Sequence, residues 1–102
     1  MRPKIKMSEL PNFDAAEFLQ TDADIAAYLS TVLEENDAGL LAAALGDIAR
    51  AQGMTQVAKE AGITREALYK ALRPGSEPRF ETVSRVCAAL GVKLVAQPLH
   101  AG

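Results

Sequence analysis

Cysteine, histidine and tryptophan are scarce in this chain of 102 residues, which has one cysteine, one histidine and no tryptophan. Cys87 has no partner for an internal disulfide, and a chain without disulfides is typical of a reducing cytosol. Cys87 and His100 are also too few and too far apart in sequence to suggest a metal site. We therefore predict a cytoplasmic protein without a metal, in which Cys87 is a small core residue rather than a nucleophile.

Long apolar runs and catalytic motifs are missing as well. No stretch is long enough to cross a membrane, and the basic residues near the N-terminus are not followed by the apolar segment of a secretory signal. No glycine-rich phosphate loop follows a strand-like segment, and no pair of carboxylates stands beside a candidate base. We expect neither a membrane partner nor a cofactor, and we expect that the protein is not an enzyme.

The residues that are present favour one small helical domain with an uneven charge. Hydrophobic residues make up 49% of the chain and aromatic residues only 5%, and alanine and leucine dominate. Residues 1–52 carry four basic and nine acidic side chains, a net charge of −5, whereas residues 53–102 carry seven basic and four acidic ones, a net charge of +3. Two oppositely charged surfaces would suit two different partners, although a difference of this size also arises by chance.

The first half of the chain contains the signals of successive helices. Residues 1–12 have two prolines and no periodicity, so we expect a flexible arm there and a single domain over residues 13–102. Asp14 can cap a short helix over residues 15–20. The spacing of Thr21 and Asp24 predicts a capping box, followed by apolar residues on one helical face at positions 25, 28, 29, 32 and 33.

A further helix is predicted between Asp37 and Gly53. Asp37 can cap its first turn, and Gly53 stands where a residue with positive φ commonly ends a helix. Arg50 lies in the last turn, where the helix dipole favours a cation.

The second half predicts three more helices and one short strand. Thr55 and Thr64 can each cap a short helix, and residues 73–78 are typical of a loop because they combine proline, glycine and serine. A last helix is expected over residues 81–90, with Val83, Val86, Cys87 and Leu90 on its inner face. Residues 92–98 alternate in part and predict a strand, although no partner strand is visible in the sequence.

Residues 55–72 have the spacing of a helix-turn-helix. Ala58 would lie where the two helices cross, because a larger side chain would push them apart. Gly62 can adopt the positive φ that ends the first helix, and Leu68 and Leu72 would turn the second helix onto the core.

The second helix would then present a polar outward face, formed by Arg65, Glu66, Tyr69, Lys70 and Arg73. Arg65 has the fork geometry that binds guanine in the major groove. Lys70, Arg73 and Arg79 can neutralise phosphates, and Thr64 stands at the helix N-terminus. The alternative is a solvated face, in which Glu66 and Lys70 form an i,i+4 ion pair worth about 0.3–0.5 kcal/mol.

The segments GMTQVAKEAGITREALYKAL and PRFETVSRVCAALGVKL resemble the addiction-module antidote proteins, which are small antitoxins with a repressor-like, Xre-type helix-turn-helix. The similarity extends upstream through LLAAALGDIARAQG. It implies a five-helix DNA-binding domain, double-stranded operator DNA as one partner and a small basic RelE/ParE-like toxin as the other. The DNA-reading positions of the family fall on Gln56, Thr64, Arg65, Glu66, Tyr69 and Lys70.

One departure from the pattern concerns Gln56. The Thr55-Gln56 pair stands two residues closer to Ala58 than the equivalent pair of many repressor-like domains. The first helix of the pair is therefore expected to be short.

The resemblance also suggests a role for the acidic half of the chain. Six carboxylates could face a basic toxin, because opposite electrostatic fields speed the encounter of two proteins. They are Asp14, Glu17, Asp22, Asp24, Glu34 and Glu35. The alternative is that they are ordinary capping and surface charges, which are favoured in the first turn of a helix.

Two other functions remain open from the sequence alone. One is a free-standing prophage-type repressor without a toxin, and the other is a helical module that binds only proteins. We expect a homodimer, because two-fold operators match two-fold proteins. The predicted strand over residues 92–98 or the last helix would supply the dimer contact, and the N-terminal arm is the other candidate.

Overall fold

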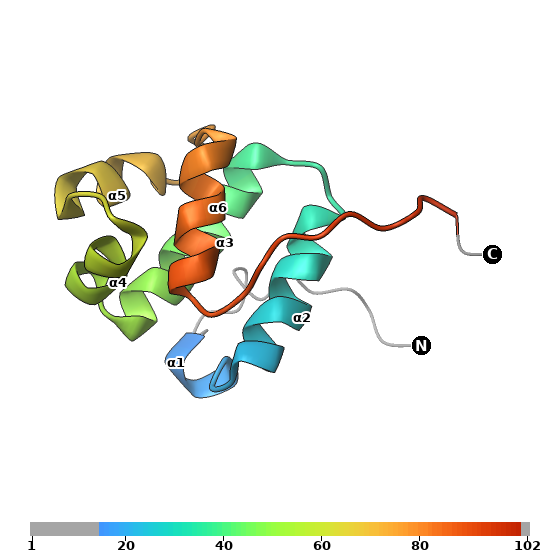
Figure 1. Cartoon of the computed structure of the whole chain (residues 1–102), viewed down its shortest axis with the longest axis horizontal. Coiled ribbons are helices and arrows are strands. Elements are labelled where there is room, and N and C mark those ends of the chain that lie inside the picture. Colours follow the sequence, from blue (N-terminus) through green and yellow to red (C-terminus); the bar gives the residue numbers. More distant parts are fainter. Residues whose placement is uncertain (1–14, 101–102) are drawn as a thin grey trace.

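Every regular element in the described part of the chain is an α-helix. The computed structural model describes residues 15–100, with side chains from residue 17 onward. The helices are α1 (Ala15–Phe18), α2 (Asp22–Leu33), α3 (Ala38–Gln52), α4 (Met54–Ala61), α5 (Arg65–Ala71) and α6 (Phe80–Ala89) (Figure 1). α1 is a single turn, so five longer helices form the body of the fold within these residues. The all-α prediction is confirmed, whereas the predicted arm over residues 1–12 and the cap at Asp14 lie outside the described residues.

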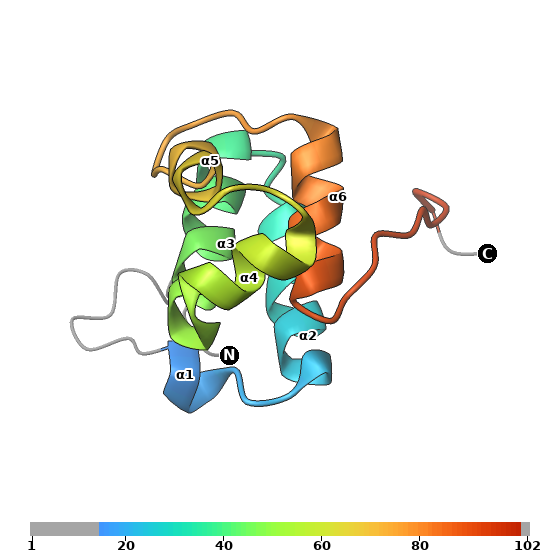
Figure 2. The ribbon, with the colours of Figure 1, turned by 60° about the vertical axis from the view of Figure 1, so that its left-hand side comes forward.

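α3 and α4 each pack against three other helices. α3 packs against α1, α2 and α4, while α4 also packs against α5 and α6. The C-terminal segment leaves α6 on the side of α2, away from α5 (Figures 1 and 2). The longer helices all contribute to one core, whose largest buried side chains include Ile25, Leu45, Ile48, Val57, Leu68 and Val86. Since α4 and α5 are too short to be stable alone, this shared burial holds them in place.

Three of the predicted caps are present. The backbone N–H of Asp24 donates to the Thr21 hydroxyl at 3.0 Å, and the backbone N–H of Thr21 donates to the Asp24 carboxylate at 3.2 Å, which completes the capping box. The backbone N–H of Leu40 donates to Asp37 at 3.1 Å. Thr64 caps α5 in the same way. Each such cap contributes about 1 kcal/mol and fixes where its helix begins.

The predicted cap at Thr55 is wrong. α4 begins at Met54, and its N-cap is Gly53, which makes no side-chain hydrogen bond. Gly53 has a φ of 109° and is both the C-cap of α3 and the N-cap of α4. Because one residue makes the whole turn between the two helices, Thr55 falls inside the first turn of α4.

The predicted strand over residues 92–98 is also wrong. These residues have no regular secondary structure in the described part of the chain, and the last helix runs over Phe80–Ala89 rather than over residues 81–90. Val92 and Leu94 are half-buried against the core, whereas Lys93 and Val95 are exposed. The alternating pattern therefore reflects one chain lying on a core, and the argument for a dimer contact at a free strand edge no longer applies.

Gly91 directs this segment onto the core. Its φ of 92° is unfavourable for residues with a side chain, and it allows the Val92 N–H to donate to the Cys87 carbonyl at 2.9 Å. A Cβ atom at Gly91 would also lie 2.5 Å from the Asp22 carboxylate. The glycine thus ends α6 and itself lies beside Asp22 at the start of α2.

Gly91→Ala is expected to lower the free energy of unfolding by about 1–2 kcal/mol, mainly because of the left-handed backbone. The Asp22 side chain is exposed and can rotate away, so its share of the cost is small. Urea denaturation of Gly91→Ala, alone and combined with Asp22→Ala, measures both contributions. An unchanged unfolding midpoint for the single variant would contradict the role of the glycine.

Candidate nucleic-acid interface

The bend between α4 and α5 is located at Gly62, as predicted. Gly62 is left-handed, with φ 74° and ψ 30°. The Ile63 N–H donates to the Ala58 carbonyl at 3.1 Å, and the Gly62 N–H donates to the Lys59 carbonyl at 3.2 Å. These two hydrogen bonds satisfy backbone groups at the C-terminal end of α4. Ala58 on α4 is buried in the core.

α5 begins at Arg65, directly after its N-cap Thr64, and has one inner and one outer face. The Ala67 N–H donates to the Thr64 hydroxyl at 3.0 Å, so that this hydroxyl is already used as the helix cap. Leu68 and the following Leu72 are buried against the core. The predicted outward residues are all exposed: Arg65, Glu66, Tyr69, Lys70 and Arg73.

Arg65 is held against Tyr69 on this outward face. Its Nη2 donates to the Tyr69 hydroxyl at 3.2 Å, and its guanidinium carbon lies 5.4 Å from the centre of the ring. The hydrogen bond to Tyr69 raises the pKa of Arg65 above its ordinary value. The contact orients the guanidinium and leaves its other N–H groups available to a ligand.

Glu66 and Lys70 do not form the i,i+4 ion pair that was expected if the face is only solvated. The ion pairs of the described residues join Arg50 to Asp47 at 2.6 Å and Arg85 to Glu81 at 2.8 Å. The ammonium group of Lys70 is therefore not neutralised by its neighbour one turn away.

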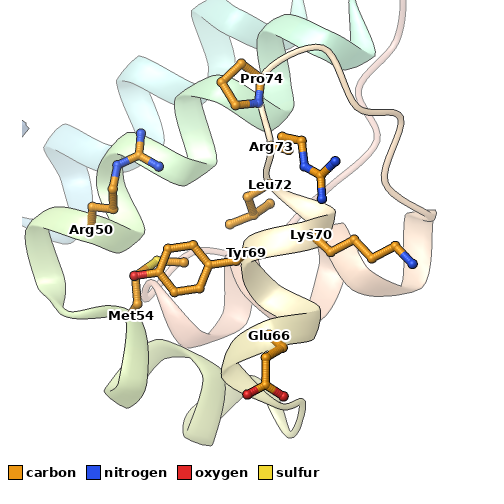
Figure 3. A pocket seen from close by; sticks show the side chains of 8 residues that line it. All are labelled: Arg50, Met54, Glu66, Tyr69, Lys70, Leu72, Arg73 and Pro74. Atoms are coloured by element: carbon orange, nitrogen blue, oxygen red, sulfur yellow. The ribbon is translucent and has the colours of Figure 1, made fainter.

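A groove lies between α5 and the junction of α3 and α4. Its volume is about 380 Å³. Figure 3 shows Tyr69, Lys70 and Arg73 on one side and Arg50 across from them, with Met54 below the Tyr69 ring. The lining residues are Arg50, Met54, Glu66, Tyr69, Lys70, Leu72, Arg73 and Pro74. The groove thus contains three cationic side chains and one acidic one.

Arg50 is the charged lining residue that was not predicted as a site residue from the sequence. It lies near the end of α3. From the local sequence alone, an arginine at this position is explained by the favourable interaction of a cation with the helix dipole. The single-residue turn at Gly53 sends the chain back so that Arg50 faces α5. No local pattern in the sequence indicates this contact, because its partners follow about twenty residues later.

The remaining predicted DNA contacts lie around this groove or beyond it. The Gln56 side chain on α4 donates to the Glu60 carboxylate at 2.7 Å. Arg79 is exposed at the N-cap position of α6, with no side-chain cap bond. Gln56 is thus engaged within α4, while Arg79 extends the basic surface past the loop that follows α5.

The predicted toxin-facing acids do not form one patch. Glu17, Asp22 and Asp24 lie around the start of α2, and Glu34 and Glu35 lie just beyond its end. A helix of 12 residues separates the two groups by about 18 Å. The Asp24 carboxylate accepts the backbone N–H groups of Gln20 and Thr21, each at 3.2 Å. Asp14 lies outside the described residues.

Other kinds of site find little support between residues 15 and 100. Cys87 is 1% exposed, as predicted for a core residue, and its burial raises the pKa of the thiol. No group of three or more histidine, cysteine, aspartate or glutamate side chains in the described part could hold a metal ion. None of the described helices has the length and apolar character needed to span a membrane.

Comparison with known proteins adds two findings. The model of a family described as "probable addiction module antidote protein" matches residues 9–98. An uncharacterized protein of Haemophilus influenzae, strain Rd, is 46% identical over 89 residues, which cover 87% of this chain and 92% of the relative. No solved structure matches this chain significantly.

Proposed function

This chain belongs to the family of probable addiction module antidote proteins, and from that membership we propose that it is the antitoxin of a type II toxin–antitoxin module. It neutralises a small basic RelE/ParE-like toxin by direct binding and represses its own operon by binding DNA. The observation that carries the proposal is the family match over residues 9–98 of the chain. An antidote family implies a toxin partner, because an antidote acts against a toxin.

The α4–α5 pair supports the DNA-binding half of the proposal. We assign residues 55–72 to a repressor-like helix-turn-helix of the Xre type, with α5 as the helix that enters the major groove. In such units the N-terminal residues of the second helix contact the base edges. Here that position belongs to Arg65, which is exposed and oriented by Tyr69. Phosphates are assigned to three exposed cations: Lys70 on the same helix, Arg73 just after it and Arg79 at the N-cap of α6.

The acidic residues of α1 and α2 support the toxin-binding half. The two groups at the ends of α2 would contact separate parts of a basic partner, rather than one small pocket. Asp24 belongs to the capping box, so it contributes its charge without leaving the helix. Opposite fields on the two proteins favour rapid association.

The proposed protein is a cytoplasmic homodimer without catalytic activity. A palindromic operator has half-sites about one DNA turn apart, roughly 34–36 Å, and such an operator requires a two-fold dimer that presents its two α5 helices at that spacing. The weak net charge of −2 does not oppose this, because DNA meets only the basic face of α5.

Co-expression with the product of the adjacent gene tests the antitoxin proposal. That product alone is expected to arrest growth, and co-expression of this chain is expected to restore growth to the level of an empty-vector strain. The two proteins are expected to purify together at a fixed ratio. Persistent arrest without co-purification would contradict the proposal, and it would favour a repressor without a toxin if promoter binding were retained.

A further inference from the structure

The groove beside α5 brings together cations that are distant in the sequence. Arg50 is on α3, Lys70 is on α5, and Arg73 lies two residues after the end of α5. Figure 3 shows Arg50 and Arg73 on opposite sides of the groove, with Tyr69 below them and the Lys70 side chain extending away from Arg50. Cations that line one groove repel each other, so their arrangement suits an anionic ligand.

The position of Arg50 is fixed by its surroundings. Its Nη2 lies 2.6 Å from the Asp47 carboxylate, and Asp47 is not among the groove-lining residues. A Cβ atom at Gly46 would lie 3.2 Å from the Arg50 guanidinium and 3.1 Å from the Leu72 carbonyl. The missing side chain at Gly46 therefore leaves room for the guanidinium beside the end of α5. The Arg50 side chain is still 48% exposed, so a ligand can reach it.

We propose that this groove binds a backbone phosphate of the duplex that α5 enters, and that Arg50 is its additional phosphate-binding residue. The inference rests on the proposed function, because it names a second contact of the same DNA. A helix in the major groove has a phosphate chain on each side. Lys70 and Arg73 are on the α5 side of the groove, so Arg50 reaches the same chain from α3. Tyr69 and Met54 offer an apolar wall to the adjoining sugar.

The expected consequence is a change in salt dependence rather than in sequence preference. Each neutralised phosphate contributes about −0.9 to the slope of log K against log salt concentration. Arg50→Gln is therefore expected to make the slope shallower by about 0.9. Over a fourfold range of salt concentration, this corresponds to about a threefold smaller loss of affinity. The ratio between operator and unrelated duplex stays the same, because a phosphate contact reads no base.

Arg85 provides a matched control. It also forms an exposed intrahelical ion pair, at 2.8 Å to Glu81, and its side chain is 50% exposed. It lies on α6 and is absent from the groove. Arg85→Gln removes the same charge and should leave the slope unchanged. Arg50→Lys keeps a point charge and should keep most of the slope while weakening binding severalfold, because the fork geometry is lost.

Fluorescence anisotropy with the promoter duplex, measured between 50 and 200 mM salt, tests this assignment. Equal slopes for Arg50→Gln and Arg85→Gln, with tight binding by the unaltered chain, would overturn the inference and leave the proposed function intact. Failure of the unaltered chain to bind the promoter would overturn both. If Arg50→Gln instead abolished co-purification with the toxin and spared DNA binding, the groove would belong to the protein partner.

A second measurement separates a DNA phosphate from free phosphate. Melting temperatures of the unaltered chain and Arg50→Gln are compared in inorganic phosphate and in chloride at equal ionic strength. Phosphate stabilises folded proteins in general because it is excluded from their surface, so any increase over chloride is expected to be the same for both proteins. A phosphate-dependent increase that Arg50→Gln removes would identify a free-phosphate site and overturn the assignment to DNA.

Discussion

Replacing Arg65 and Lys70 together by alanine is expected to weaken promoter binding about 100-fold. The Arg65 guanidinium is exposed at the start of α5, and Lys70 follows it on the same outward face. A well-made arginine contact to a base discriminates by about 1–3 kcal/mol, and loss of a phosphate contact adds to this. A total near 3 kcal/mol corresponds to about two powers of ten in the dissociation constant. Gel retardation with the upstream DNA of the gene measures the effect.

The control removes one arginine and one lysine elsewhere. Arg85 lies on α6, and Lys93 lies in the exposed segment after it. Arg85→Ala combined with Lys93→Ala therefore changes the net charge by the same amount. Binding by this control is expected to stay within a fewfold of that of the unaltered chain. If both double variants bind equally well, α5 is not the recognition helix.

DNA binding and toxin binding are expected to respond differently to the replacement of Arg65 and Lys70. Neither Arg65 nor Lys70 lies on α1, on α2 or just beyond the end of α2, where the acidic residues assigned to the toxin are found. The double variant is therefore expected to co-purify with the toxin as before, while it no longer retards DNA. A loss of both activities would place the toxin on the α5 face, against our assignment of the acidic residues.

The features of the fold that depend on neighbouring residues were predictable from the sequence. The caps at Thr21, Asp37 and Thr64 each involve an N–H three residues later, so the spacing alone defines them. The same holds for the bend at Gly62, where a left-handed residue closes a helix. The buried face of α6 was predicted correctly from the helical spacing of its apolar residues.

The errors occurred where the path of the chain decides between local possibilities. Thr55 has a capping side chain, but Gly53 alone makes the turn between α3 and α4, and α4 therefore starts too early for Thr55 to cap it. Residues 92–98 have a strand-like pattern because Val92 and Leu94 lie on the core. A strand needs a partner for its backbone groups, and the structure places none beside this segment among the described residues.

The candidate site was predictable on one side only. The outward residues of α5 follow from the helical period around Leu68. Arg50 does not, because its position in the groove requires α3, the turn at Gly53 and α5 to be placed together. Charge patterning in the sequence assigns Arg50 to the acidic half of the chain, whereas the fold brings it to the basic face.

Leu68→Ala is expected to destabilise the whole fold by about 3–5 kcal/mol. Leu68 is 0% exposed and is the buried residue of the seven-residue α5. Truncating a buried leucine loses its transfer free energy and leaves a cavity, which together cost about 2.7–5 kcal/mol in well-packed cores. Domains of this size have a total stability of about 5–15 kcal/mol. Since each kcal/mol shifts the melting temperature by about 4–8 °C, a decrease of more than 10 °C is expected by circular dichroism.

Leu99 provides the matched control, because it is the same residue type at 91% exposure. Leu99→Ala is expected to change the stability by less than about 0.5 kcal/mol. The two variants together separate burial from side-chain chemistry. DNA binding by Leu68→Ala should decrease even below its melting temperature, because Leu68 and Leu72 hold α5 in the orientation that presents Arg65 and Lys70. Equal melting temperatures for the two leucine variants would show that α5 is not anchored through Leu68, and its outward face would then have no fixed direction toward DNA.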